Sequence, residues 1–315
     1  MNKKRLYDEI VNLLKKNNEN DHEYSIKLDV PLKDYTSFKV GGPADILVEP
    51  GSIDNMITTL NYFNDQDISY FVLGNGSNVI FRDGGYRGVV ITTRFDNRKT
   101  PMSCDNTVLK ADAGVLLSTL AKYAAQNSLS GMESVSGIPG SIGGAVYMNA
   151  GAYGGEIKDI ITSAEVYDPE SNQIQIIKAD DMDLGYRRSV FQSNKKVILN
   201  VEFRLEKSEK VNILEQMKEL TIKRNSKQPV NYPSAGSFFK RPEGHFAGKL
   251  VEEAGLKGLK KGGAQISELH SGFMINKDGA TAQDIEDLME VVRAQVYEKF
   301  GVMLEPEVKI LGESK

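Results

Sequence analysis

The chain has 315 residues, of which 40% are hydrophobic and 26% are charged, an ordinary composition for a globular protein. Its net charge of −4 gives no indication of a nucleic-acid-binding surface, and its single cysteine excludes an internal disulfide. No stretch approaches the roughly 20 apolar residues that a membrane-spanning helix needs. The basic N-terminus also lacks the continuous apolar core of a signal peptide. We therefore expect a cytoplasmic protein of two or three domains.

The first hundred residues alternate between helix and strand patterns. The N-terminal segment 1–16 places Leu6, Ile10, Leu13 and Leu14 on one helical stripe, which predicts a surface amphipathic helix. A second helix is predicted over 53–64. Apolar runs predict strands at 44–50, 70–73, 79–81 and 88–91. This alternation is typical of an α/β region.

The middle of the chain begins a second unit of this kind. A strand over 107–111 and a helix over 115–125 precede a glycine-rich segment at 131–156. Three strands are then predicted, at 163–167, 173–177 and 196–205. The turn sequence Asp168-Pro169-Glu170-Ser171-Asn172 indicates a hairpin between the first two.

The last third begins with a charged helix over 207–227, a plausible domain boundary. A helix over 247–254, a strand over 273–275 and a helix over 281–300 follow. Thr281 and Asp284 have the spacing that caps the start of the last helix, and Gly301 is placed to end it. A final strand is predicted over 302–310.

The glycine-rich segment 131–156 is the most informative feature. It has no charged residue between Glu133 and Glu156. Glycine permits a positive φ and close approach of the backbone, so we expect a loop whose N–H groups face a ligand. Residues 140–148 are expected to form a helix with its N-terminal N–H groups at an anion. A flexible linker is the alternative, but Ile142 and Val146 argue against it.

Two further glycine loops occur, at 40–44 and 74–78. The second follows a strand and carries G-x-G at Gly74 and Gly76, but Val79 occupies the place of the third glycine. A Rossmann site is therefore disfavoured, and no P-loop is present. Either these loops are tight turns, or all three converge on one extended cofactor.

Arg187 and Arg188 are candidates for binding an anion. Flanking apolar residues predict a partly buried pair, and a buried arginine needs an anionic partner. That partner is either a structural acid or a ligand carboxylate. Arg224 and Lys227 lie one turn apart at a helix end, where they could bind a diphosphate or complement the helix dipole.

Ser237 and Glu307 are candidates for proton transfer. Ser237 lies between Gly236 and two phenylalanines. It is either part of a polar turn or a proton donor in an apolar, water-poor setting. Glu305 and Glu307 lie in the predicted final strand, so one carboxylate faces inward unless the strand is a solvent-facing edge.

Six ordered motifs extend from about Val30 to Ile310: VGGPA, LGNGSN, SGIPGSIGGAVYMNAGAYG, YRRSVF, AGSFFK and LEPEV. In this order they resemble the UDP-N-acetylenolpyruvoylglucosamine reductase family. The resemblance implies an α/β and α+β architecture. Its parts are an FAD-binding fold of the vanillyl-alcohol-oxidase type, in two subdomains, and a C-terminal α+β substrate-binding domain. The domain boundaries expected are 1–30, 31–100, 101–206, 207–301 and 302–315.

The resemblance also implies the activity. Such a protein would use NADPH and non-covalent FAD to reduce UDP-N-acetylglucosamine enolpyruvate to UDP-N-acetylmuramate, in peptidoglycan precursor synthesis. We expect no nucleic acid, membrane or metal partner, and a monomer or weak dimer. Only 50 residues (237 − 187) separate Arg187 from Ser237. The chain therefore resembles the shorter type, which lacks an inserted substrate lid.

The family's motifs assign roles to residues of this chain. Arg187 would stabilise the substrate carboxylate, Ser237 would supply the proton, and Glu307 would complete the catalytic site. The substrate-binding positions are Tyr186, Arg187, Arg224, Lys227 and Ser237. The implied cofactor-binding residues are Gly41, Gly42, Pro43, Gly74, Asn75, Gly76, Ser77, Asn78, Ser136, Gly137, Ile138, Pro139, Gly140, Ser141, Gly143, Gly144, Ala145, Asn149 and Gly151.

Two other functions remain open. The same fold could serve an FAD-dependent oxidase of a small alcohol or sugar, but the glycine loops contain no His or Cys for covalent FAD attachment. The second alternative function is that of a regulator that binds a nucleotide sugar and has no enzymatic activity. The presence of Arg187, Ser237 and Glu307 argues against it.

Overall fold

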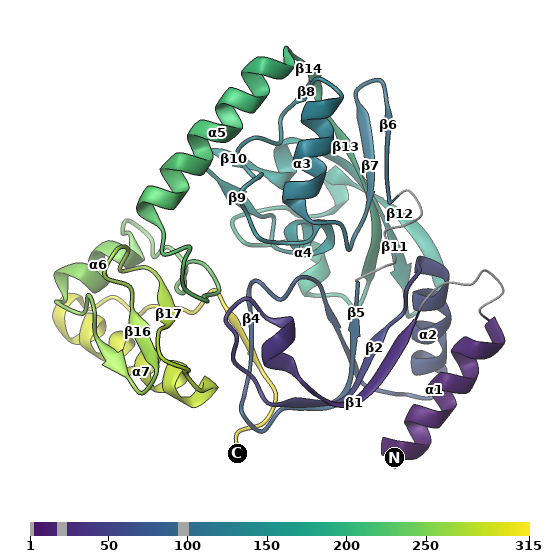
Figure 1. The fold of residues 1–315 in the computed structure, drawn as a ribbon, viewed down its shortest axis with the longest axis horizontal. Helices are drawn as coiled ribbons and strands as arrows, with labels where there is room; N and C mark the ends of the chain where they lie inside the picture. Colours follow the sequence, from purple (N-terminus) through teal and green to yellow (C-terminus); the bar gives the residue numbers. More distant parts are fainter. Residues whose placement is uncertain (1–2, 18–23, 94–100) are drawn as a thin grey trace. The chain divides into compact units, whose positions relative to one another are not determined.

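The structure is a computed structural model that describes residues 3–17, 24–93 and 101–315. By internal contacts the chain forms two compact units (Figure 1). Unit 1 comprises 1–28, 46–75 and 88–222, and unit 2 comprises 29–45, 76–87 and 223–315. Each unit therefore combines stretches that are distant in sequence. The contiguous domain boundaries expected above stay a prediction.

The first layer of unit 1 pairs α1 (Lys3–Asn17) with α2 (Ile53–Asp65), which lie side by side in Figure 1. Both helices are confirmed as predicted. Leu6, Ile10 and Leu14 are buried in the same hydrophobic cluster as Met56 and Leu60. The neighbouring sheet has the order β1–β2–β5–β3. Its strands are β1 (Ser25–Pro31), β2 (Pro43–Glu49), β5 (Tyr86–Thr92) and β3 (Tyr70–Leu73).

The second layer of unit 1 is a five-stranded antiparallel sheet with the order β12–β11–β13–β7–β6. The strands are β12 (Gln173–Lys178), β11 (Ile161–Asp168), β13 (Val197–Arg204), β7 (Val108–Asp112) and β6 (Met102–Asp105). The predicted hairpin is confirmed, since Asp168 pairs with Gln173. Helices α3 (Leu117–Gln126) and α4 (Ile142–Tyr147) share a core with this sheet. The sequence prediction missed β1 and the edge strand β6.

One long helix and several short elements complete the first 227 residues. Helix α5 (Lys210–Lys227) begins in unit 1 and ends in unit 2. The short strands are β8 (Leu129–Ser130), β9 (Gly151–Ala152), β10 (Gly155–Glu156) and β14 (Glu206–Lys207). The 3₁₀ turns are η2 (Ile157–Asp159), η3 (Ala179–Asp181) and η4 (Val190–Gln192).

Unit 2 is built around α7 (Ala282–Phe300), which begins and ends as predicted. Thr281 and Asp284 form a reciprocal capping box, and Gly301 closes the helix in the left-handed conformation. The other elements of the unit are η1 (Leu32–Tyr35), β4 (Val79–Phe81), α6 (Ala247–Glu253), β15 (Lys260–Lys261), β16 (Ala264–Ile266), β17 (Met274–Asn276) and β18 (Lys309–Leu311). Helix α7 shares a buried core with α6 and with the sheet β15–β16–β17.

The predicted continuous strand over 302–310 is wrong. The only strand there is β18, which pairs in parallel with β4. Pro306 explains the interruption, because proline has no N–H to donate to a ladder. It makes only an isolated bridge to Phe239.

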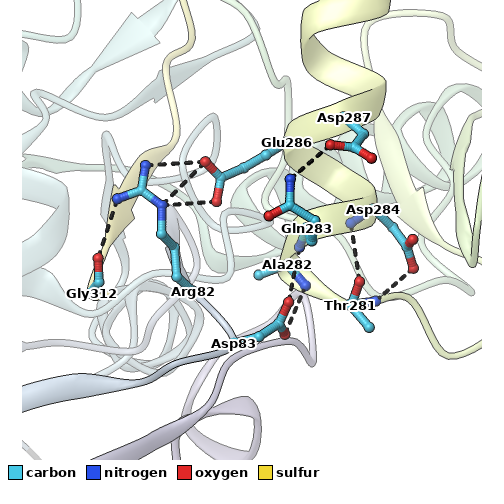
Figure 2. A network of polar contacts seen from close by, with 9 residues as sticks. All are labelled: Arg82, Asp83, Thr281, Ala282, Gln283, Asp284, Glu286, Asp287 and Gly312. Atoms are coloured by element: carbon cyan, nitrogen blue, oxygen red, sulfur yellow. Dashed lines mark hydrogen bonds and ion pairs between the residues drawn. The ribbon is translucent and has the colours of Figure 1, made fainter. Parts of the chain in front are cut away.

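A polar network attaches the start of α7 to the end of β4 (Figure 2). Arg82 makes a bidentate ion pair with Glu286, at 2.9 Å from Nε to Oε1, and donates to the Gly312 carbonyl. The Asp83 carboxylate accepts from the first two N–H groups of α7, those of Ala282 and Gln283. These contacts use helix donors that have no intrahelical partner.

Within the described part of the chain, none of the helices combines the length and apolar character needed to cross a bilayer.

Candidate active site

Helix α4 forms where the glycine-rich segment predicted a helix, but its N-terminus does not offer free donors. Ser141 caps it by accepting from the Gly144 N–H. The Ile142 and Gly143 N–H groups donate to the carbonyls of Val115 and Ala113, each at 2.8 Å. The expectation that these N–H groups face an anion is therefore wrong. Both N–H groups are already hydrogen-bonded to carbonyls of the segment that follows β7.

The loop after β3 does offer main-chain donors. Among the described residues, the N–H groups of Gly74, Asn75, Gly76 and Ser77 donate to no protein atom. Consecutive N–H groups of this kind are the donors that phosphate oxygens need, and the cofactor role predicted for these residues stays a prediction.

In unit 1 this loop lies directly against the glycine-rich segment. The Asn75 amide donates to the Pro139 carbonyl at 2.6 Å. A Cβ at Gly74 would lie 2.5 Å from the Ser141 hydroxyl, so a larger residue there would have to displace this helix-capping side chain. The structure thus brings together the predicted cofactor residues 74–75 and 139–141.

In unit 2 the loop 40–43 packs against the end of β4. The Gly42 N–H donates to the Arg82 carbonyl at 3.0 Å. A Cβ at Gly42 would lie 2.2 Å from the Asp83 carbonyl oxygen. These glycines have a packing reason of their own. The cofactor role of Gly41, Gly42 and Pro43 stays a prediction.

Asn149, another predicted cofactor residue, is fully buried and has its side chain engaged within unit 1. Its amide donates to the Glu156 carboxylate at 2.8 Å and to the Gly185 carbonyl at 2.9 Å. Its amide oxygen accepts from the Lys158 N–H. The side chain therefore links the glycine-rich segment to the loop that carries Arg187.

Arg187 is half-buried and has a φ of 53°, which lies in the left-handed region. Its guanidinium donates to the Gly151 carbonyl at 3.4 Å and lies 5.3 Å from the centre of the Tyr186 ring. Arg188 is exposed and pairs with Asp183 at 2.8 Å. The predicted partial burial is confirmed for Arg187 and wrong for Arg188.

The Arg187 guanidinium also lies near an acid. The pKa of Glu156 is held below its ordinary value, chiefly by its hydrogen bond to Lys158 and also by Asn149 and the Arg187 charge. The Glu156 carboxylate therefore attracts the Arg187 guanidinium, and this attraction favours one orientation of the Arg187 side chain.

In unit 2, strand-like pairing brings the Ser237 segment beside the Glu307 segment. Ser237 bridges to Phe273, and the Phe238 N–H donates to the Gly272 carbonyl at 2.9 Å. The Glu307 N–H donates to the Phe238 carbonyl at 2.8 Å. The Asn78 amide holds the Glu307 carbonyl at 3.2 Å.

The side chains on this pairing differ in exposure. Ser237 is exposed, whereas Phe238 and Phe239 are buried. Of the two interpretations of this segment, the exposure agrees with the polar turn, and the role of Ser237 as a proton donor stays a prediction. Glu307 is half-buried, while Glu305 is exposed and pairs with Lys240.

Arg224 and Lys227 occupy the last turn of α5, as predicted. Arg224 is half-buried and Lys227 is exposed. Their position is compatible with both interpretations, a diphosphate site or charges that complement the helix dipole. His270, which had no predicted role, accepts from the Gly272 N–H, and burial lowers its pKa.

Sequence reasoning missed Asn276, a buried residue that connects three parts of unit 2. Its amide donates to the Phe38 carbonyl, its amide oxygen accepts from the Ala280 N–H at 2.8 Å, and its N–H donates to Pro233. The signal was an asparagine at the end of an apolar strand. A buried amide of this kind needs internal partners.

Comparison with known proteins gives the family. A profile described as "FAD binding domain" matches residues 44–176, and "UDP-N-acetylenolpyruvoylglucosamine reductase, C-terminal domain" matches 228–311. FAD is therefore the cofactor, and the FAD-binding fold with a C-terminal α+β domain is confirmed.

Relatives named UDP-N-acetylenolpyruvoylglucosamine reductase match nearly the whole chain. The protein of Clostridioides difficile (strain 630) is 46% identical over 313 residues, covering 99% of this chain and 100% of the relative. That of Clostridium novyi (strain NT) is 50% identical over 288 residues, covering 91% and 92%. The crystal structure of the reductase (MurB) from Thermus caldophilus has a TM-score of 0.76 at 34% identity, covering 91% of this chain and 98% of that one. This chain belongs to the UDP-N-acetylenolpyruvoylglucosamine reductase family.

Proposed function

We propose that the chain reduces UDP-N-acetylglucosamine enolpyruvate to UDP-N-acetylmuramate in peptidoglycan precursor synthesis, with NADPH as the electron donor. The observation that carries the proposal is the end-to-end match to reductases of that name, with Arg187, Ser237 and Glu307 at the family's motif positions. A cytoplasmic location and a monomeric or weakly dimeric state stay predictions.

Bound FAD would supply the redox chemistry, taking a hydride from NADPH and delivering it to the enolpyruvyl double bond. Two features support FAD binding by this chain. They are the consecutive main-chain donors at 74–77 and the close glycine packing of the loops beside Pro139 and Ser141. The N–H groups can donate to the phosphate oxygens of FAD, and the absence of side chains at the glycines leaves room for its flat ring system.

Arg187 is proposed to bind the substrate carboxylate. Hydride addition to a double bond beside a carboxylate leaves negative charge on the adjacent carbon and on the carboxylate. A guanidinium presents paired N–H donors to such a group and stabilises that charge. Tyr186 lies against this guanidinium and is proposed to limit its orientations.

Ser237 is proposed to give its hydroxyl proton to the carbanion-like carbon. Serine is a weak acid, so its placement matters more than its pKa. Its backbone pairing to Phe273 and the neighbouring Phe238–Gly272 bond support a fixed position. Glu307, whose N–H is bonded to Phe238, is proposed to complete the site through a water or a protonated carboxyl. Arg224 and Lys227 are proposed to bind the diphosphate.

The test is an anaerobic absorbance titration of the purified protein. We expect a flavin band that bleaches with NADPH and returns when UDP-N-acetylglucosamine enolpyruvate is added. A band that returns only with oxygen would replace the proposal with the oxidase. A preparation without flavin that cannot be reconstituted would favour a nucleotide-sugar-binding protein.

A further inference from the structure

Arg187 occupies a backbone conformation that it does not favour. Ten described residues other than glycine have a positive φ. Most are asparagine or aspartate, which tolerate this region; Arg187, at 53°, is one of the exceptions. Such a residue persists only where surrounding contacts enforce its conformation. The contacts that hold the Arg187 backbone therefore matter for its side chain.

One of these contacts comes from the side chain of Gln192. Its amide nitrogen donates to the Arg187 carbonyl at 2.9 Å. The same nitrogen donates to the Tyr147 carbonyl, also at 2.9 Å. Tyr147 is the last residue of α4, so Gln192 ties the strained carbonyl to the end of the helix in the glycine-rich segment.

Gln192 is itself well anchored. It ends the 3₁₀ turn η4, in which Phe191 is buried in the core of unit 1. Ser189, at the start of that turn, donates to the same Tyr147 carbonyl at 2.7 Å. On the opposite side of the loop, Gly185 and Arg188 exchange two main-chain hydrogen bonds, and the Asn149 amide donates to Gly185. Both flanks of Arg187 are thus held within unit 1.

We propose that Gln192 is a positioning residue that sets the orientation of Arg187 toward a substrate carboxylate. The inference rests on the proposed function, since it assumes that Arg187 binds that carboxylate. Gln192 is exposed, so its side chain adds little to the core. Its contribution lies in the contacts of its amide nitrogen, which are to the Tyr147 carbonyl, to the Met148 sulfur at 3.6 Å and, directly, to the Arg187 carbonyl.

The first test replaces the donor without changing the side-chain length. Gln192→Met should lower the affinity for UDP-N-acetylmuramate, which carries the carboxylate, about tenfold. This is the size of effect expected when a hydrogen bond to a fixed group is lost. UDP-N-acetylglucosamine, which lacks that carboxylate, should bind unchanged. Both ligands are titrated by the absorbance change of the bound flavin. Ser193→Ala is the matched control, because its exposed hydroxyl donates to Val190 and touches neither Arg187 nor Tyr147.

The same variant should split the half-reactions. Reoxidation of the reduced protein by UDP-N-acetylglucosamine enolpyruvate should slow about tenfold, whereas flavin reduction by NADPH and the thermal midpoint should stay as in the parent. Equal weakening of both nucleotide ligands, or equal loss in both half-reactions, would overturn the proposal in favour of a general structural role.

A double-mutant cycle gives the decisive result. If Gln192 acts through Arg187, Gln192→Met should cost nothing further in an Arg187→Ala background. The same tenfold loss in both backgrounds would refute the proposal. A parent protein that binds neither nucleotide would instead contradict the proposed function. A parent that binds both, with Gln192→Met indistinguishable from it, would refute only the role of Gln192.

Discussion

The two units hold their candidate catalytic residues in different ways. In unit 1, Arg187 sits on a strained loop, and its carbonyl is held by an exposed side chain, Gln192. In unit 2, Ser237 and Glu307 are positioned mainly by main-chain hydrogen bonds between Phe238, Gly272 and Glu307 itself. In the same unit, the buried side chain of Asn276 links the Phe38 carbonyl to the Ala280 N–H.

This difference indicates where chemistry and stability can be separated. The exposed side chain of Gln192 can be replaced without opening the core, so its loss should affect only the orientation of Arg187. Main-chain pairing is insensitive to side-chain replacement, so the side chain of Ser237 can be removed cleanly. Asn276 is different, because its side chain is buried and hydrogen-bonded inside unit 2. Its loss should therefore lower the stability of the fold more than it changes the chemistry.

The largest effect should follow Ser237→Ala, which tests whether the main chain alone fixes this site. Loss of a positioned proton donor should slow substrate reduction by about 10³-fold, while flavin reduction by NADPH survives. Stopped-flow absorbance measures the two half-reactions separately. Ser234→Ala, in the same loop, is the control. If Ser237→Ala impairs both half-reactions equally, the serine is structural.

Asn276→Ala should cost stability in unit 2. The change leaves the Phe38 carbonyl and the Ala280 N–H without their partner in a buried place. Each unsatisfied group costs about 1–3 kcal/mol, so we expect a loss of about 3 kcal/mol in urea unfolding. The exposed Asn231→Ala should be neutral. An unfolding midpoint in urea equal to that of the parent would show that the hydrogen bonds of Asn276 do not stabilise unit 2.

Glu286→Gln should have a smaller effect, because the Arg82 ion pair is only partly shielded. The Arg82 and Glu286 side chains are 34% and 19% exposed. A bidentate pair in this setting contributes about 1 kcal/mol. The exposed pair Lys249–Glu253 in the same unit supplies the control, and Glu253→Gln should change stability negligibly. Equal effects of the two changes would mean that the network in Figure 2 is not cooperative.

Asp112 in unit 1 should give the smallest effect, with the opposite sign. Burial raises the pKa of Asp112 to about 6, with the Glu165 charge adding to the shift and the Asn200 hydrogen bond opposing it. The folded state therefore binds more protons than the unfolded state between about pH 4 and 6, and Asp112 makes stability fall as pH rises through this window.

Asp112→Asn keeps an acceptor for the Asn200 amide and removes that titration. After allowance for solvent screening, we expect the variant to be up to about 1 kcal/mol more stable than the parent at pH 7 and similar at pH 4. Urea unfolding at both pH values checks this. A parallel pH dependence in parent and variant would exclude Asp112 as its source.

The sequence by itself determined the features that depend on neighbouring residues. Thr281, Asp284 and Gly301 fixed both ends of α7, because caps act within one turn. The turn at 168–172 fixed the hairpin of β11 and β12 for the same reason. The ordered motifs, compared with a known family, also indicated the cofactor and the candidate residues Arg187, Ser237 and Glu307.

The tertiary structure decided what depends on residues distant in the chain. Carbonyls of Ala113 and Val115 take the N–H groups of α4, and no local pattern predicts this. β18 pairs with β4, more than 200 residues earlier in sequence. The exposure of Ser237, the burial of Asn276 and the bond from Gln192 to Arg187 arise in the same way. A short motif specifies a turn or a cap, but hydrogen-bond partners and burial are set by the packing of the whole unit.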